Sequence, residues 1–266
     1  MATKRTGGEL VVASLVENGT THAFGVPGES YLPVLDALHD VADRLTFVVC
    51  RQEGGAAYMA EAYGKLTGRP GVVLVTRGPG ATNAAIGIHM AMQDSTPMIV
   101  LIGQVGSDFV DREAFQEIDY RRMFAPVAKW AAQIDRADRV PEYMARAFRT
   151  AMSGRPGPVV LALPEDMLSA QASVADAGRV SSVAVSAATA DVKAAHELLA
   201  TARNPLVIVG GSRWDEAACN RLRDYVEING LAVACAFRRQ DLFDNRHANY
   251  AGDVGIGIRP ELATRV

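Results

Sequence analysis

A single carboxylate stands where the sequence could do chemistry. Glu53 follows the short apolar run at residues 47–50 and opens an alanine-rich segment that reaches Leu66. Apolar runs of strand length that alternate with helix-length segments are typical of strands buried on both faces of a parallel sheet, and ligands bind at the carboxyl ends of such strands. The pattern predicts a functional carboxylate at Glu53, although a helix-start glutamate stabilised by the helix dipole would give the same pattern.

Two glycine loops could lie beside this carboxylate. Residues 25–30 follow a short strand and end at Ser30, which we expect to cap the next helix. Residues 78–83 follow a later strand, and their spacing matches neither the dinucleotide fingerprint nor the P-loop. We interpret this second loop as a close approach of the backbone to a flat ligand or a neighbouring domain. The first loop shares an edge with Glu53 only if its strand lies beside the strand at 47–50, as a β-α-β unit favours.

Strands and helices must alternate to position these loops. The connection at residues 107–123 is rich in charge, and a connection of this length inside a compact domain is more often functional than idle. The alternation predicts an α/β fold, with a parallel-sheet domain that carries helices on both faces. The expected strands lie at 22–24, 47–50, 72–76, 98–103, 127–131 and 159–163, and the expected helices at 8–17, 31–39, 53–66, 84–92 and from Pro141.

A second rhythm of strands and helices begins near Asp191. It holds two strands, a Gly210-Gly211 turn and a helix, and two strands make too small a sheet to stand alone. The segment before it is rich in Ala, Ser and Val, which is typical of a surface linker. We therefore predict a first domain at residues 1–167, a linker at 168–190, and an incomplete Rossmann-like α/β central domain at 191–266.

The composition of the 266 residues excludes several classes of protein. Hydrophobic residues make up 49% and charged residues 21%, and the net charge of −3 gives no reason to expect nucleic acid or an anionic membrane as a partner. No apolar stretch approaches the ~20 residues of a membrane span. Cys50, Cys219 and Cys235 are odd in number and widely spaced, so we expect free thiols in a reducing cytoplasm.

Short motifs follow one another along the whole chain in a recognisable order. They are Phe24-Gly25-Val26-Pro27-Gly28-Glu29, Arg51-Gln52-Glu53-Gly54-Gly55-Ala56-Ala57, Gly78-Pro79-Gly80-Ala81-Thr82-Asn83, Gln93-Asp94-Ser95-Thr96-Pro97, Gly103-Gln104-Val105, Phe115-Gln116-Glu117, Pro126-Val127-Ala128-Lys129-Trp130 and Gly154-Arg155-Pro156-Gly157-Pro158. Together they resemble the thiamine-diphosphate-dependent decarboxylase and carboligase superfamily, in particular its acetolactate synthase (acetohydroxyacid synthase) branch. The resemblance implies an N-terminal pyrimidine-binding domain, followed by the start of the central domain.

The resemblance also implies a role for Glu53. The matching glutamate of the family bonds N1′ of the cofactor's aminopyrimidine and favours the imino tautomer, which removes the C2 proton of the thiazolium. The resulting ylide adds to a small 2-oxo acid, carbon dioxide leaves, and carboligation follows. Because apolar surroundings disfavour a charged carboxyl, the alanine-rich flank of Glu53 suits a group that shares a proton with the ring.

Other positions match functional positions of the family. Ser95 would otherwise be a helix-end cap, Lys129 a solvated charge at a strand end, and Arg155 an exposed turn residue. The resemblance implies that the cofactor contacts are Pro27, Gly28, Glu53, Pro79, Asn83 and Gln116, that Ser95 and Lys129 lie near the substrate, and that Arg155 touches FAD where FAD is bound.

The chain departs from the synthases at three positions. Gln52 stands in place of the usual histidine, Arg77 in place of serine, and Glu165 in place of lysine. The charge reversal at Glu165 leaves the identity of the 2-oxo acid open. Residues 237–243 also differ from the usual central-domain sequence, so FAD, ADP and no ligand remain alternatives there.

The family's third domain has no counterpart in these residues. That domain holds the diphosphate and Mg²⁺ through a Gly-Asp-Gly start and a later asparagine, so the resemblance implies no metal ligand in this chain. It also implies a homodimer or homotetramer and no activity for this chain alone. The alternatives are a decarboxylase without carboligation, a non-catalytic nucleotide-binding module that uses Gly210-Gly211, and a dimerisation fragment that pairs through the helices at 53–66 and 84–92.

Overall fold

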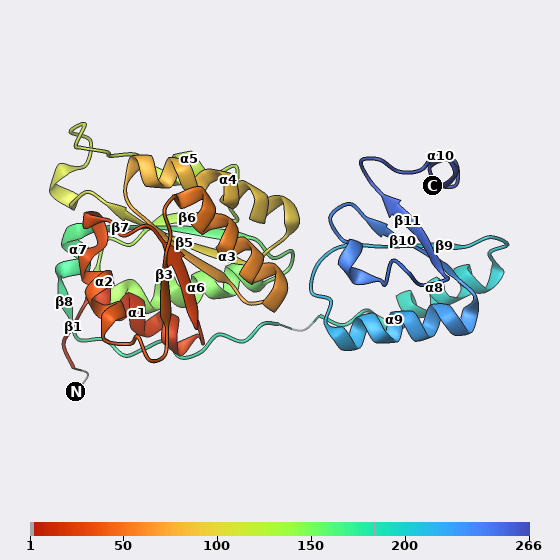
Figure 1. Cartoon of the computed structure of the whole chain (residues 1–266). Coiled ribbons are helices and arrows are strands. Elements are labelled where there is room, and N and C mark those ends of the chain that lie inside the picture. Colours follow the sequence, from red (N-terminus) through yellow and green to blue (C-terminus); the bar gives the residue numbers. More distant parts are fainter. Residues whose placement is uncertain (1–2, 184) are drawn as a thin grey trace. The chain divides into compact units, whose positions relative to one another are not determined.

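The computed structural model describes residues 3–183 and 185–266, which form two compact units. The first unit ends at Val183, and the second covers the residues from 185 onwards. Each unit has its own parallel sheet and its own apolar core (Figure 1). The predicted α/β fold class is therefore confirmed, whereas the domain boundaries at 167 and 190 stay a prediction.

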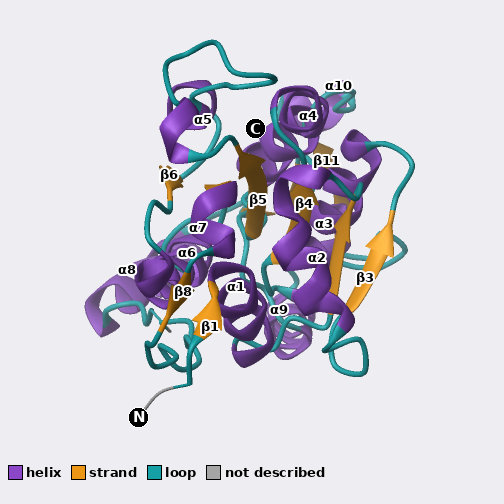
Figure 2. Ribbon diagram, turned by 90° about the vertical axis from the view of Figure 1, so that its left-hand side faces the viewer, coloured by secondary structure: helices purple, strands orange, loops and turns teal. Residues whose placement is uncertain are grey.

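The first unit is built on a six-stranded parallel sheet. Its strand order is β3-β2-β4-β5-β7-β6, with β3 at one edge and β6 at the other (Figure 2). Because β2 and β3 are neighbours, as a β-α-β unit predicts, the segments that follow them leave the sheet at the same edge. The strands are β2 (His22–Gly25), β3 (Thr46–Val49), β4 (Gly71–Val75), β5 (Met98–Gln104), β6 (Trp130–Gln133) and β7 (Pro158–Pro164).

Both faces of this sheet are buried. In β4, Val72 and Leu74 belong to one apolar cluster, whereas Val73 and Val75 belong to the cluster on the opposite face. Continuous apolar runs are required in such strands because side chains alternate between two covered faces. The first face is covered by α1 (Gly7–Glu17), α2 (Leu32–His39), α6 (Val140–Met152) and α7 (Glu165–Ser169), and the second by α3 (Glu53–Thr67), α4 (Gly78–Asp94) and α5 (Tyr120–Phe124) (Figure 1).

The segment expected as a linker lies largely on the first unit. A short antiparallel ribbon joins β1 (Arg5–Thr6) to β8 (Gln171–Ala172). Further along, the backbone N–H of Val180 donates to Oδ1 of Asn18 at 2.9 Å, and Val180 packs against the core. Long-range backbone contacts of this kind have no local sequence signal.

Several local predictions are wrong. The strand expected at 127–131 begins only at Trp130, because the Val127 N–H bonds the carbonyl oxygen of Phe124 in a turn. Ser30 does not cap α2, because it lies in the 3₁₀ turn η1 (Glu29–Tyr31) and its hydroxyl bonds Oγ1 of Thr76 at 2.9 Å. The helix after the second glycine loop begins at Gly78 itself and not near Ala84. Pro79 explains the early start, since its fixed φ is pre-organised for the first helical turn.

The second unit has one more strand than the sequence indicates. Its parallel sheet has the order β11-β10-β9. The third strand, β11, holds Gly252 at φ +132° and Asp253, which interrupt the apolar pattern by which strands are predicted. The elements are α8 (Thr189–Thr201), β9 (Leu206–Val209), α9 (Glu216–Asn229), β10 (Ala232–Ala236), η4 (Gln240–Leu242), β11 (Tyr250–Val254) and α10 (Pro260–Ala263).

The three cysteines are free, as predicted. Cys235 is fully buried in the core of the second unit, and Cys50 and Cys219 are half-buried. Among the described residues, no helix is both long enough and apolar enough to cross a membrane.

Gly87 permits the close packing of α3 and α4. A Cβ at this position would lie 2.5 Å from Cβ of Ala57 and 2.8 Å from its carbonyl carbon. We therefore expect Gly87→Ala to lower the free energy of unfolding by about 1–3 kcal/mol through overpacking. Chemical denaturation with Gly55→Ala as the matched control measures the effect. Gly55 is also helical and its Cβ would meet only Oε1 of Gln52 at 3.9 Å, so this control should lose no stability; equal losses would contradict the packing argument.

Thiol reactivity provides a test of the second core. Burial raises the pKa of Cys235 to about 11, so its reactive thiolate is scarce at neutral pH as well as inaccessible. We expect Cys50 and Cys219 to react first with a disulfide reagent at pH 8, and Cys235 to react only at the rate at which the second unit opens. Labelling followed by peptide mass analysis distinguishes the three sites, and early modification of Cys235 would show that this core is open.

Candidate functional site

Glu53 lies where the parallel strands of the six-stranded sheet end. We call this side of the sheet, formed by the carboxyl ends of the strands, its carboxyl edge. It is the first residue of α3, immediately after the segment that leaves β3, and it is half-buried. Oε2 of Glu53 accepts a hydrogen bond from Nδ2 of Asn83 at 2.9 Å. Among the described residues, no group bonds Oε1. Glu53 thus has one oxygen fixed by α4 and one oxygen left to bind a ligand.

Glycines keep the space beside this carboxylate open. A Cβ at Gly80 would lie 3.5 Å from Oε1 of Glu53 and 2.9 Å from Cγ2 of Thr76. A Cβ at Gly28 would lie 2.7 Å from Cβ of Thr76. Thr76 therefore touches both glycine loops, which come together at this residue because β2 and β4 are neighbours, and the second loop also borders Glu53.

Tyr31 is the buried neighbour of the same site. Its ring is 1% exposed, and its hydroxyl donates to the carbonyl oxygen of Val26. Burial, and then the charge of Glu53, raise the pKa of Tyr31 well above its usual range. Tyr31 therefore stays a hydrogen-bond donor at any physiological pH, and it holds the first loop in its turn.

A cavity of about 460 Å³ opens at the start of α4. It brings together Pro79, Asn83 and Gln116, three of the residues that the sequence predicts as cofactor contacts. The N–H of Gly78 donates both to the carbonyl oxygen of Gln116 at 3.1 Å and to the hydroxyl of Tyr120 at 2.8 Å. Burial raises the pKa of Tyr120 to about 12, so this hydroxyl is also neutral.

The charge-rich connection forms one wall of this cavity. Asp111, Glu113 and Gln116 have φ values of +61°, +52° and +64°, a conformation that non-glycine residues adopt at a cost. The carboxylate of Glu117 offsets part of that cost, because it accepts from the N–H of Asp111 at 2.8 Å and of Ala114 at 3.1 Å. Strained backbone held in this way is typical of a binding loop.

Ser95, Lys129 and Arg155 lie on the opposite side of the sheet, where the strands begin. We call this side its amino edge. They precede β5, β6 and β7, whereas Glu53 follows β3. Ser95 ends α4 in the left-handed conformation, and its Oγ accepts from Nε of Arg155 at 2.7 Å. Within the first unit, the structure therefore does not bring these three residues to Glu53, and their roles toward substrate and FAD stay predictions.

Each of these three residues has partners at a helix end. Nη2 of Arg155 donates to the carbonyl oxygens of Met92 at 2.9 Å and Gln93 at 3.1 Å. Nζ of Lys129 donates to carbonyl oxygens at the end of α6, including that of Ser153 at 2.7 Å, and burial lowers the pKa of Lys129. Cations near carbonyl groups at a helix C-terminus stabilise that end.

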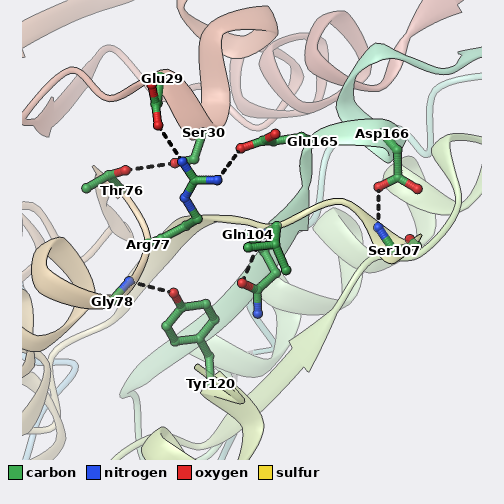
Figure 3. Close-up of polar contacts among 11 residues, drawn as sticks. Glu29, Ser30, Thr76, Arg77, Gly78, Gln104, Ser107, Tyr120, Glu165 and Asp166 are labelled. Atoms are coloured by element: carbon green, nitrogen blue, oxygen red, sulfur yellow. Dashed lines mark hydrogen bonds and ion pairs between the residues drawn. The ribbon is translucent and has the colours of Figure 1, made fainter. Parts of the chain in front are cut away.

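Arg77 is the residue whose role the sequence alone does not reveal. Its Nη1 donates to Glu165 and its Nη2 to Glu29, each at 2.6 Å (Figure 3). Arg77 and Glu165 departed separately from the acetolactate synthase pattern, yet they form one ion pair at the carboxyl edge. The only sequence signal is the opposite charge of two residues that follow β4 and β7.

Comparison with known proteins now identifies the family. The model for the thiamine pyrophosphate enzyme N-terminal TPP binding domain matches residues 5–123, and the model for the thiamine pyrophosphate enzyme central domain matches residues 192–266. The chain belongs to the thiamine pyrophosphate enzyme family. Thiamine pyrophosphate is the same cofactor as thiamine diphosphate, so the resemblance drawn from the motifs is confirmed.

The chain is similar to large subunits of acetolactate synthase. It is 36% identical over 257 residues to acetolactate synthase isozyme 3 large subunit of Escherichia coli K12. That alignment covers 94% of this chain and 45% of the relative. It is 35% identical over 255 residues to acetolactate synthase of Mycobacterium bovis, covering 94% of this chain and 41% of that protein. The chain thus spans less than half the length of these relatives.

The N-terminal family match covers all the predicted site residues that lie at the carboxyl edge. Its range includes Glu53, Asn83 and Gln116, and also Ser95, and it ends before Lys129 and Arg155. The part of the chain that the structure describes holds no group of three or more His, Cys, Asp or Glu side chains that could bind a metal ion.

The cap at the end of α4 is open to a direct test. Arg155→Met removes the hydrogen bonds to Ser95, Met92 and Gln93, and we expect the free energy of unfolding to fall by about 1 kcal/mol. Arg149→Met, which removes an exposed arginine from α6, is the control and should change the free energy by less than about 0.5 kcal/mol. Indistinguishable variants in urea denaturation would mean that Arg155 does not support the helix.

Proposed function

We propose that this chain supplies the aminopyrimidine-binding half of an active site that uses thiamine diphosphate to act on a 2-oxo acid. The observation that carries the proposal is the Glu53 carboxylate, with Oε2 held by Asn83 and Oε1 beside Gly80. A flat heteroaromatic ring needs a polar anchor and close backbone approach, and both are present at this edge. The match to the N-terminal TPP binding domain supports the same assignment.

The residues of the chain have separate parts in this proposal. Glu53 would hold a proton between Oε1 and N1′ of the ring, and Asn83 would keep the carboxylate in place. Gly28 and Gly80 would leave room for the ring, and Gln116 would close the cavity from the charge-rich connection. Bound thiamine diphosphate would supply the electron sink for decarboxylation and for carbon–carbon bond formation.

Carboligation after decarboxylation is the reaction that the relatives support. Those relatives are named acetolactate synthases, and they cover 94% of this chain. A decarboxylase that protonates its product in place of ligating it is the alternative. Because the chain spans less than half of each relative, we assign the diphosphate and Mg²⁺ to a part of the whole protein beyond these residues.

We also propose that the chain works as a homodimer. Several large apolar side chains near Glu53 are exposed, among them Val49 at 65%, Met59 at 48% and Ile86 at 56%, on β3, α3 and α4. Exposed large apolar side chains that gather on one side of a protein mark interfaces. A second copy that covers α3 and α4 would also exclude water from the carboxylate edge.

Glu53→Gln tests the proposed function. In the natural gene product that contains this chain, loaded with thiamine diphosphate and Mg²⁺, we expect exchange of the cofactor's C2 proton to slow by at least about 100-fold, because the amide cannot hold the transferred proton. Glu142→Gln, on the exposed surface of α6, should exchange at the wild-type rate. A near-normal rate of C2 proton exchange in Glu53→Gln would contradict the role proposed for Glu53.

The substrate class has its own measurement. Carbon dioxide release should be detected from at least one small 2-oxo acid, and the products should show whether a new carbon–carbon bond forms. C2 exchange without turnover of any 2-oxo acid would leave the cofactor assignment intact and contradict the substrate class.

A further inference from the structure

Arg77 joins three segments that leave the sheet at its carboxyl edge. It follows β4 and is the N-cap residue of α4, while Glu29 follows β2 and Glu165 follows β7. The Arg77 side chain is only 9% exposed, whereas those of Glu29 and Glu165 are 71% and 43% exposed. A buried guanidinium needs a paired carboxylate, and Glu29 and Glu165 supply that pairing to Arg77.

The pairing with Glu29 holds the turn at residues 28–31 against the sheet. Ser30 is fully buried, bonds Thr76 through its hydroxyl, and fits against Gly103, where any Cβ would overlap it. Gly28 packs on Thr76 in the same way. Figure 3 shows these residues as one group, in which Glu29 pairs with Arg77 and Ser30 bonds Thr76 beside that ion pair.

This turn borders the Glu53 carboxylate. Tyr31 is close enough for the charge of Glu53 to act on its hydroxyl. Thr76, which bonds Ser30 of the turn, also borders Gly80. A Cβ at Gly80 would lie 2.9 Å from Cγ2 of Thr76 and 3.5 Å from Oε1 of Glu53. A displacement of the turn would therefore move atoms that line the space in front of Oε1.

We propose that Arg77 is a positioning residue for the aminopyrimidine site. Through Glu29 it fixes the turn at 28–31, and through Glu165 it anchors that turn to the end of β7. The role rests on the proposed function of Glu53. Nη1 and Nη2 of Arg77 each already donate to a carboxylate of this chain, and its Nε is buried and has no partner among the described residues.

The charges of the trio suggest a rescue experiment. Arg77→Ser leaves the carboxylates of Glu29 and Glu165 facing each other with no cation. Adding Glu165→Lys to that variant returns a cation near Glu29. We expect the new lysine, at the end of β7, to hold the turn by pairing with Glu29 in place of Arg77. Arg136→Ser is the matched control, since it breaks an exposed Arg136–Asp138 pair in the same unit and touches neither loop.

The first measurement is amide hydrogen exchange of residues 28–31 in this chain. The Tyr31 N–H bonds the carbonyl oxygen of Gly28, so its exchange reports opening of the turn. We expect Arg77→Ser to accelerate this exchange by about tenfold or more, because hydrogen bonds to charged groups are the stronger ones. The double variant should return most of the protection, and Arg136→Ser should match the wild type.

The second measurement is the equilibrium affinity for thiamine diphosphate with Mg²⁺ in the natural gene product. We expect Arg77→Ser to weaken binding at least about fivefold, and the double variant to regain most of that loss. A loosened turn with unchanged affinity would overturn the positioning role and make the trio purely structural. If Arg77→Ser does not fold, Glu165→Gln, which keeps one hydrogen bond, should give a smaller loss of affinity, and no loss would again overturn the role.

The two proposals fail in different ways. If the wild-type protein does not bind thiamine diphosphate, the proposed function fails and the positioning role fails with it. If the wild type binds and the Arg77 variants bind equally well, only the positioning role fails.

Discussion

Burial of the six-stranded sheet on both faces is the constraint on which the rest of the first unit depends. Val72 to Val75 can carry only apolar side chains, because each alternate residue enters one of two covered clusters. Polar groups must therefore stand where strands begin or end. Glu53 and Arg77 follow strands, whereas Lys129 and Arg155 precede them. Burial of both faces of the sheet therefore places these polar residues at its carboxyl edge or at its amino edge.

Helix direction gives the two edges opposite electrostatic character. α3 and α4 begin at the carboxyl edge, where their free N–H groups and partial positive charge favour the Glu53 carboxylate. α4 and α6 end at the amino edge, where Arg155 and Lys129 donate to exposed carbonyl groups. The positions of Glu53 at one edge and of Arg155 and Lys129 at the other thus follow from a single topology, and at the carboxyl edge Gly28 and Gly80 also leave room for a ligand.

Sequence patterns predicted what depends on local chemistry. The apolar runs predicted the strands of the first sheet, and the β-α-β unit predicted that β2 and β3 are neighbours. They did not predict β11, because Gly252 and Asp253 break its apolar run. Nor could they predict the bond between Ser30 and Thr76, since an isolated serine before a helix is more often a cap. Contacts between distant side chains have no period that a local pattern can show.

The trio of Glu29, Arg77 and Glu165 shows why departures from a family pattern should be interpreted in space. In the sequence, Arg77 and Glu165 are 88 residues apart and look like two separate changes. At the carboxyl edge they are one change, because a guanidinium buried to 9% exposure cannot stand without its carboxylates. Replacing Arg77 alone would leave the Glu29 and Glu165 carboxylates without their shared cation, and replacing Glu165 alone with lysine would put two cations together. Each residue of the trio is therefore constrained by the other two, and a charge reversal that suggests a new substrate on its own is explained first by the need to pair Arg77.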